Sequence, residues 1–355
     1  MTVDPSTDPD PPQDEDTMEE DESKAENEIE REDGEDKEDR DSEGKDPEEE
    51  EEEEKIPEAP LTQEIVNECI SLLCKIGNGL AHAYVRLDVK ERELTDISML
   101  STFIHLRYVD VSSNSIKNIS ALNNLHHLLT LKAEKNLLAS AQLDELPYLQ
   151  TASFAFNKIS NTDGIEHPLL ESLNLSHNQI TRVTLDPSKL SMLHTLELRN
   201  NKLTSTEGII LPTLKNLYLA QNQINSLKDL EQLTNLHLLH LRENQLDNFE
   251  GFTANLKSLQ YINVRGNLIQ NKKEVTKLRV LPMLKALVMS DCPISDEDDY
   301  RIEVLITLRR IDRLDKDEYT DDERQEAEEI YEQRRLENQT DDGSTKMEDS
   351  VANEE

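Results

Sequence analysis

The chain has 355 residues, of which 76 are acidic and 38 are basic, so its formal net charge is −38. This balance argues against nucleic acid and anionic membranes as partners, because both require a basic protein surface. The charge is uneven: residues 1–60 carry 30 acidic and 6 basic side chains (−24), residues 316–355 carry 16 and 5 (−11), and residues 61–315 carry 30 and 27 (−3). The sequence therefore predicts a nearly neutral folded centre between two acidic ends.

Residues 1–60 are predicted to be a disordered acidic arm. They contain no aromatic residue, and runs such as 47-PEEEEEEEKIPEAP-60 repel themselves. Such a segment cannot bury enough apolar surface to offset the entropy lost on ordering. A solubilising role is the simplest interpretation, and docking onto a basic partner surface is the alternative.

The chain starts MTVDPSTDPD, without the basic and apolar stretches of a secretory signal. No apolar run approaches the roughly 18–20 residues that a membrane-spanning helix needs. The three cysteines, Cys69, Cys74 and Cys292, lack metal-ligand spacing. We therefore expect an intracellular protein whose cysteines are reduced and buried as small apolar residues.

Residues 61–83 are predicted to form a helical cap. Thr62 is a suitable N-cap residue, and Gly77 is expected to end the helix. Between them, an apolar stripe at helical spacing consists of Ile65, Cys69, Ile70, Leu73 and Ile76.

A repeat follows the template L-x-x-L-x-L-x-x-N-x-L. Its asparagines are Asn114, Asn136, Asn157, Asn178, Asn201, Asn222, Asn244 and Asn267, with spacings of 22, 21, 21, 23, 21, 22 and 23 residues. A further unit has Cys292 in the asparagine position, and an irregular first unit, residues 84–105, has Arg92 there. The pattern predicts an α/β solenoid, a leucine-rich-repeat horseshoe of about ten 21–23-residue repeats over residues 84–299.

Each repeat position has a physical interpretation. The x-L-x-L-x core is a short strand, because its side chains alternate between the two faces. The asparagine amide both donates and accepts hydrogen bonds, so it can satisfy backbone groups where the chain leaves the strand. Gly164, Gly208 and Gly251 each lie seven residues after an asparagine and predict positive φ or close packing on the convex side. Stretches such as 229–236 and 251–259 could form a helical turn or two there.

Residues 300–337 are predicted to be a C-terminal cap followed by a charged helix. Thr320 and Glu323 have the spacing of a capping box, which would start that helix. Residues 338–355 are polar and are predicted to form a disordered acidic tail.

The outward positions of the predicted strands show where a partner could bind. In the second half of the concave face they gather Arg199, Tyr218, His240, Arg242, Tyr261 and Arg265. Arginine and tyrosine are enriched at protein interfaces, so we interpret this group as a patch for an acidic or helical segment. The alternative is an ordinary solvated surface.

The sequence has no phosphate-binding loop, dinucleotide fingerprint, zinc-protease motif or nucleophile elbow. His237 and His240 lack the further ligands that a zinc site needs. We therefore expect no enzymatic activity, no cofactor, no metal and no small-molecule substrate.

Three segments depart from a generic repeat: 71-SLLCKIGNGLAHAYVRLDVKERELTDI-97, 138-LASAQLDELPYLQTASFAFN-157 and 216-NLYLAQN-222. They resemble the leucine-rich-repeat proteins of the radial spokes of motile cilia, over about residues 61–335. The resemblance implies a non-enzymatic scaffold that holds other radial-spoke and axonemal proteins, in the cytoplasm and cytoskeleton of the cilium and sperm flagellum. It carries no catalytic residues.

Two other functions remain open. A phosphatase-regulating repeat protein has similar 22-residue units and a similar C-terminal cap, and it would bind a phosphatase catalytic subunit. An acidic histone-binding chaperone has a similar charge, but its acidic segment follows the repeats, whereas the larger acidic block precedes them here.

Overall fold

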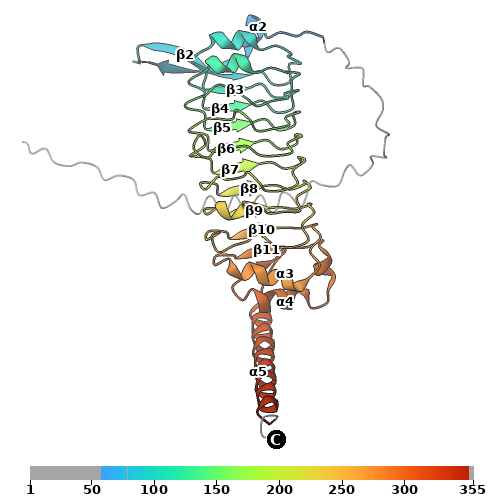
Figure 1. Ribbon diagram of the computed structural model, residues 1–355. Helices are drawn as coiled ribbons and strands as arrows, with labels where there is room; N and C mark the ends of the chain where they lie inside the picture. Colours follow the sequence, from blue (N-terminus) through green and yellow to red (C-terminus); the bar gives the residue numbers. More distant parts are fainter. Residues whose placement is uncertain (1–56, 78, 352–355) are drawn as a thin grey trace, which may run out of the picture. The chain divides into compact units, whose positions relative to one another are not determined.

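The computed structural model describes residues 57–77 and 79–351, with only the backbone of 338–351. Their strands form one 13-stranded sheet in chain order. Strand β1 (Ile70–Ile76) is antiparallel to β2 (Ala81–Asp88), the strands from β2 to β12 (Arg313–Leu314) are parallel, and β13 (Asp317–Glu318) turns back antiparallel. The repeats contribute β3 (Tyr108–Asp110), β4 (Thr130–Lys132), β5 (Thr151–Ser153), β6 (Ser172–Asn174), β7 (Thr195–Glu197), β8 (Asn216–Tyr218), β9 (Leu238–His240), β10 (Tyr261–Asn263) and β11 (Ala286–Val288). Figure 1 shows them stacked along the solenoid. The predicted leucine-rich-repeat solenoid is confirmed.

The core follows directly from the repeat. Each of the three-residue strands β3 to β11 buries its middle residue, as Leu217 and Leu239 do, and these residues are aligned by the strand register. Fully burying one such side chain stabilises the fold by about 1.5–3 kcal/mol. A coil could not bury its aliphatic face alone, so stacking on both neighbours is what makes each coil stable.

A left-handed turn follows every strand of the repeat. The residue before each asparagine has a φ of about +50° to +60°, for example 56° at Gln221 and 54° at Glu243. Outside glycine this conformation costs roughly 1 kcal/mol or more. Only one of these turns contains a glycine, Gly266, so the surrounding contacts must hold the others in place.

The asparagine amide supplies those contacts, as Asn222 illustrates. Its Nδ2 donates to the carbonyls of Leu219 (3.1 Å) and Ala220 (3.2 Å) in its own coil and to that of Leu198 (2.9 Å) in the preceding coil. Its Oδ1 accepts from the Leu203 N–H at 3.1 Å. Each buried amide thus closes its own turn and joins two coils.

The glycine position is constrained by close packing on the convex side. Gly208 has φ +87°, and a Cβ atom there would lie 2.3 Å from the Val183 carbonyl oxygen. Gly251 has φ +105°, and a Cβ atom would lie 2.6 Å from the Leu227 oxygen. The predicted reasons for glycine, positive φ and close packing, are both confirmed.

The convex side contains less helix than the sequence suggested. Residues 229–236 include the short 3₁₀ helix η3 (Leu230–Gln232), whereas 251–259 form turns without a helix. The other helical segments are η1 (Ser98–Thr102), η2 (Ser120–Asn124), α3 (Lys272–Val275), η4 (Thr276–Val280) and η5 (Pro293–Asp296). A coil of 21–23 residues leaves few residues to cross the convex side, and 3₁₀ or extended chain covers more distance per residue than an α-helix does.

The N-terminal cap corrects the prediction of a helix over 61–83. Helix α2 (Gln63–Cys69) starts as expected, with the Thr62 hydroxyl accepting from the Ile65 N–H at 3.4 Å, but it ends at Cys69. The chain then forms β1 and reverses at Gly77 and Gly79, which have φ of 55° and 81°. The sequence Gly-Asn-Gly over 77–79 is a hairpin signal, and pairing with β1 covers the edge that β2 would otherwise leave open.

Arg92 confirms that the first unit differs from the rest. Its side chain lies 3.5 Å from a Glu68 carboxylate oxygen and 3.5 Å from the Cys69 sulfur, so it ties α2 to the solenoid. Asn114 bonds to this unit much as the later asparagines bond to the coil before them: its Oδ1 accepts from the N–H groups of Arg92 and Leu94, and its Nδ2 donates to the Val89 carbonyl.

The C-terminal cap consists of α4 (Tyr300–Thr307), the β12–β13 hairpin and α5 (Asp321–Val351). The capping box forms, with the Thr320 N–H donating to Glu323 at 2.7 Å and the Glu323 N–H donating to the Thr320 hydroxyl at 3.2 Å. Arg301 also binds Glu323, at 2.5 Å, which joins α4 to α5. The helix runs through Val351, so the boundary expected near residue 338 lies inside it; this stretch has no proline to stop it.

The predicted acidic arm lies almost entirely outside the described residues. Its last residues, 57–60, are described and belong to the fold, because the Ala59 carbonyl accepts from the Thr95 N–H at 2.9 Å and Pro60 forms a bridge with Asp96. Within the described part of the chain, none of the helices has the length and apolar character required to span a membrane.

His167 is a second buried polar group that the solenoid depends on. It is 1% exposed, and its Nδ1 accepts from the Leu146 N–H at 3.2 Å. Burial lowers the pKa of His167 to about 4 from an ordinary value of 6.5, partly opposed by Glu166. The imidazole is therefore neutral in the folded protein at neutral pH.

We expect Asn222→Leu to lower the free energy of unfolding by about 3–5 kcal/mol, because three carbonyls and one N–H lose a buried partner. Urea unfolding followed by circular dichroism measures this change. Asn124→Leu, at an exposed site, is the control. A loss below about 1 kcal/mol at Asn222 would contradict the structural role.

We expect stability to fall as the pH is lowered from about 6.5 towards 4, because the unfolded state takes up a proton on His167 before the folded state does. His167→Gln should reduce the loss between pH 7 and pH 5 by about 2 kcal/mol. Urea unfolding at the two pH values measures it, with the exposed His126→Gln as control. An unchanged pH dependence would show that His167 does not titrate as described.

Candidate interaction surface

The concave patch is built by three adjacent strands. Tyr218, His240 and Tyr261 lie on β8, β9 and β10, at positions whose side chains point away from the solenoid core. The strand register aligns Tyr218 with His240, whereas Tyr261 is aligned with Leu238, so it lies diagonally across from the imidazole.

The three rings contact one another. Tyr218 and His240 are stacked, with ring centroids 5.2 Å apart and an interplanar angle of 22°, and His240 and Tyr261 are also 5.2 Å apart at 39°. The Arg199 guanidinium extends the row, 4.6 Å from the centre of the Tyr218 ring, where its charge interacts favourably with the ring face.

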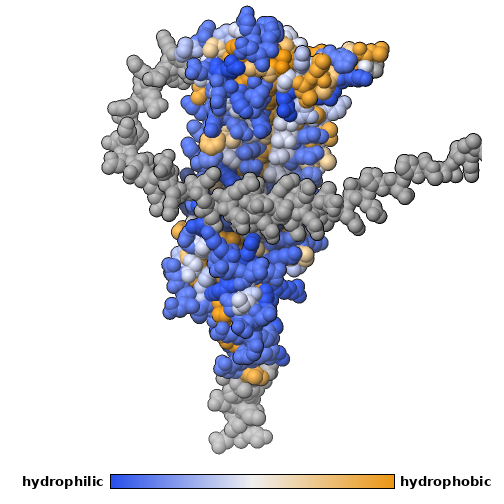
Figure 2. All heavy atoms as spheres, turned by 180° about the vertical axis from the view of Figure 1, so that it is seen from behind, coloured by the Kyte–Doolittle hydropathy of each residue, from blue (hydrophilic) through white to orange (hydrophobic). Residues whose placement is uncertain are grey.

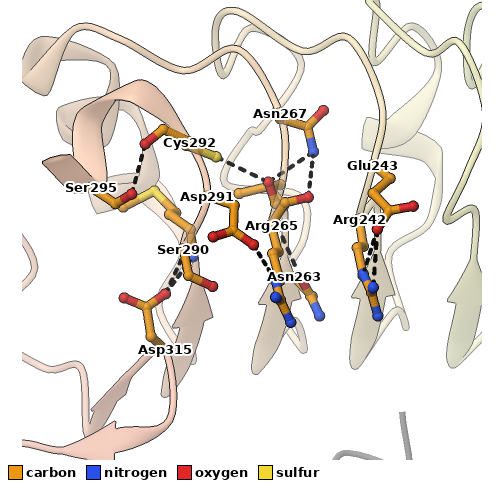
Figure 3. Close-up of polar contacts among 12 residues, drawn as sticks. Arg242, Glu243, Asn263, Arg265, Asn267, Ser290, Asp291, Cys292, Ser295 and Asp315 are labelled. Atoms are coloured by element: carbon orange, nitrogen blue, oxygen red, sulfur yellow. Dashed lines mark hydrogen bonds and ion pairs between the residues drawn. The ribbon is translucent and has the colours of Figure 1, made fainter. Parts of the chain in front are cut away.

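The other two arginines form ion pairs at the end of the strands, as Figure 3 shows. Arg242 lies 3.0 Å from a Glu243 oxygen, and its side chain is 15% exposed. Arg265 lies 2.7 Å from Asp291, one coil further on, and is 31% exposed. Each carboxylate holds its guanidinium in one orientation.

His240 is buried among these cations, which keeps it neutral. Burial, followed by the charges of Arg199 and Arg242, lowers the pKa of His240 to about 3. The imidazole is therefore uncharged at neutral pH, and the positive charge of this surface comes from the arginines.

The sequence placed all six predicted residues on the concave strands or at their ends, and the structure brings them together across β7 to β10. It corrects one expectation: Tyr218, His240 and Tyr261 are buried, with exposed fractions of 7%, 5% and 8%. Sequence alternation specifies which face a side chain occupies but not how neighbouring coils pack their rings.

Sequence reasoning missed Glu243 and Asp291. Both occupy the left-handed turn position, at φ 54° and 59°, which directs them beside the arginines. Their place immediately before the asparagine position was a usable signal, because that position repeats with the same phase in every coil.

The asparagine ladder ends beside this patch. Cys292 is 2% exposed, and its thiol donates to the Val264 carbonyl at 3.2 Å, so it partly replaces an amide (Figure 3). Burial raises the pKa of this thiol. Asp315 accepts from the N–H groups of Met289 and Ser290, both at 2.8 Å, where the next repeat would begin. The expected burial holds for Cys292, whereas Cys69 and Cys74 are half-buried.

Known proteins match this chain in its repeats and over most of its length. A family model described as "Leucine Rich repeats (2 copies)" matches residues 212–254, and one described as "Leucine Rich repeat" matches residues 166–182. Human leucine-rich repeat-containing protein 23 is 54% identical over 272 residues, covering 76% of this chain and 79% of the human protein. The chain belongs to the leucine-rich repeat-containing protein 23 family.

Other members of the leucine-rich repeat-containing protein 23 family match over the same extent. The Bos taurus protein is 52% identical over 272 residues and the Xenopus tropicalis protein 50% over 273 residues; each match covers 76% of this chain, and 80% and 78% of those proteins. Such repeat proteins are typically interaction scaffolds, and the family's shared fold favours that role.

Solved structures support the fold. A leucine-rich-repeat protein of Leptospira interrogans has a TM-score of 0.51 at 25% identity, covering 65% of this chain and 72% of that one. The TLR13–ssRNA13 complex has a TM-score of 0.52 at 24% identity, covering 64% and 38%. These similarities concern the solenoid alone.

Proposed function

We propose that this protein is a non-enzymatic scaffold of the radial spokes in motile cilia and sperm flagella, where it holds other spoke proteins in place. The observation that carries the proposal is membership of the leucine-rich repeat-containing protein 23 family over 76% of the chain. The resemblance to radial-spoke repeat proteins over 71–97 supports it further, because that segment includes the β1–β2 hairpin, which is no part of a generic repeat.

We further propose that the concave patch contacts an acidic segment of a neighbouring spoke protein. The stacked rings and the paired carboxylates fix the three guanidinium groups before binding, so little side-chain entropy remains to be lost. Arginine can also bind a carboxylate with two parallel hydrogen bonds, which a flexible ammonium group cannot do.

The location of the protein tests the scaffold role. We expect transcripts mainly in testis and multiciliated epithelium, and antibody staining along the axoneme. Uniform expression in dividing cells, together with co-purification of a phosphatase catalytic subunit, would instead favour the phosphatase-regulating alternative. Histone binding that is lost on deleting residues 1–60 would favour the chaperone.

Charge reversal tests the concave patch. We expect Arg242→Glu with Arg265→Glu to reduce capture of spoke proteins from solubilised axonemes about ten-fold, because carboxylates would replace the two guanidinium groups beside Glu243 and Asp291. The unfolding midpoint should change by no more than about 2 °C, since both arginines are partly exposed. Quantitative pulldown and a thermal melt measure the two effects.

The matched control is Arg182→Glu with Lys257→Glu, which makes the same charge change at exposed sites outside the strands. Equal capture by the patch variant and the control variant would contradict the concave contact while leaving the scaffold role to be judged by location.

A further inference from the structure

A second surface lies on the edge of the solenoid where the strands begin. We call this surface the strand-start rim. It consists of the residues that lie three positions before each repeat strand, where each coil turns from the convex side into the sheet. In the first five repeats these residues are apolar or aromatic: His105, His127, Tyr148, Leu169 and Met192. In the next three repeats they are Thr213, Asn235 and Ser258. Met283 occupies this position in the repeat after these, so the N-terminal half holds the uninterrupted apolar run and Met283 lies apart from it.

The N-terminal half of the rim is continuous and exposed. The rings of His105 and His127 are stacked with centroids 6.4 Å apart, and those of His127 and Tyr148 are 6.2 Å apart. Tyr148 is 50% exposed, Leu169 39% and Met192 40%. Pro147 and Pro168 precede two of these residues and restrict the backbone that presents them.

The polar residues of the C-terminal half are used within the fold. The Thr213 hydroxyl donates to the Leu193 carbonyl at 2.9 Å, and the Asn235 amide donates to the Pro212 carbonyl at 2.8 Å. The same position thus serves coil-to-coil contacts in one half and presents apolar side chains to the outside in the other.

The β1–β2 hairpin projects past the strand-start edge at the N-terminal end of the rim. Strand β2 begins at Ala81 but pairs with β3 only from Arg86 onward, so its first part extends past the strand-start edge. Figure 1 shows this projection, and Figure 2 shows that hydrophobic residues gather on it. Leu73 is 57% exposed and Tyr84 49%. The Arg107 N–H donates to the Val85 carbonyl at 2.8 Å, which joins the hairpin to the first rim turn.

The rim offers side chains to a partner rather than backbone groups. In each of its first turns the N–H after the rim residue bonds back to the same coil: Leu106 to Phe103, Leu128 to Leu125, Leu149 to Leu146, Leu170 to His167 and Leu193 to Leu190. An extended strand lying here would therefore find no ladder to join. A helix satisfies its own backbone, and it can place one side chain per turn of about 5.4 Å along the stripe.

Charges beside the stripe specify the partner further. Glu145, Glu166 and Glu171 are exposed and lie within three residues of Tyr148 or Leu169. Lys189 is 3.4 Å from Glu166 and neutralises part of this charge, but the acidic side chains predominate around the middle of the stripe. A helix with lysine or arginine beside its apolar face is complementary to this arrangement.

We propose that the apolar half of the strand-start rim, with the exposed face of the β1–β2 hairpin, docks an amphipathic helix of a partner protein whose apolar face is flanked by basic residues. This surface is separate from the concave patch and does not depend on the radial-spoke assignment.

The probe is a fluorescein-labelled helical peptide of about 18 residues, alanine-based, with leucines along one face and lysines on both flanks. Binding to the full chain is measured by fluorescence anisotropy at about 0.15 M salt, which limits attraction to distant charges. A second peptide with serine in place of each leucine measures attraction to the acidic segments alone, and a third has glutamate in place of each lysine.

We expect Tyr148→Ser with Leu169→Ser to weaken binding of the leucine–lysine peptide about ten-fold, and the other two peptides to bind about ten-fold more weakly to the unaltered protein. The matched control is Met283→Ser, because Met283 is 46% exposed in the same repeat position outside the stripe. It should leave the affinity within about two-fold of the unaltered protein. Thermal melts verify that every variant is folded.

Three results would overturn the proposal: equal affinity for the unaltered and the Tyr148/Leu169 variant proteins, equal binding of the serine peptide, or equal binding of the glutamate peptide. Light scattering provides a further test. A dimer that the Tyr148/Leu169 variant dissociates would show that a second copy of this chain covers the rim instead.

Discussion

The hydrogen bonds of the repeated asparagine amides are the constraint on which the rest of this structure depends. Each amide holds a left-handed turn that a non-glycine residue would otherwise avoid, and it bonds to the carbonyl of the preceding coil. The turn ends the strand and sends the chain to the convex side, so the strand length, the coil length and the strand register all follow from it. Leucine burial supplies the stabilising free energy, whereas the amides determine which residues of adjacent coils lie opposite each other.

Because the leucines and asparagines determine the fold, the other positions of the repeat can differ between coils. The patch on β7 to β10 and the apolar half of the strand-start rim occupy different positions of the same repeat, and only the coil of β7 contributes to both. Side chains in one position are brought into contact by the stacking of coils, as the rings of Tyr218 and His240 are. A scaffold can thus carry two chemically distinct surfaces without altering its core.

The sequence predicted the structure best within the repeats and at the starts of the helices capped by Thr62 and Thr320. The phase of the asparagines predicted the strands, the buried aliphatic residues and the packed glycines, because each has a local cause that recurs. It failed for residues 70–76, where an apolar pattern compatible with a helix forms a strand instead; the open edge of β2, a non-local feature, decides the outcome. It also predicted the face but not the burial of His240, because ring packing depends on residues one coil away.

The presence of Cys292 in place of an asparagine affects how the solenoid would respond to force. In a stack of coils pulled from its two ends, every junction carries the same tension, so the weakest junction sets the strength of the whole. All eight asparagine amides donate both within their own coil and to the preceding one. The Cys292 thiol makes a single bond, and thiols are weak donors. Extension of the solenoid would therefore begin between the coils of β10 and β11, at the C-terminal end of the concave patch.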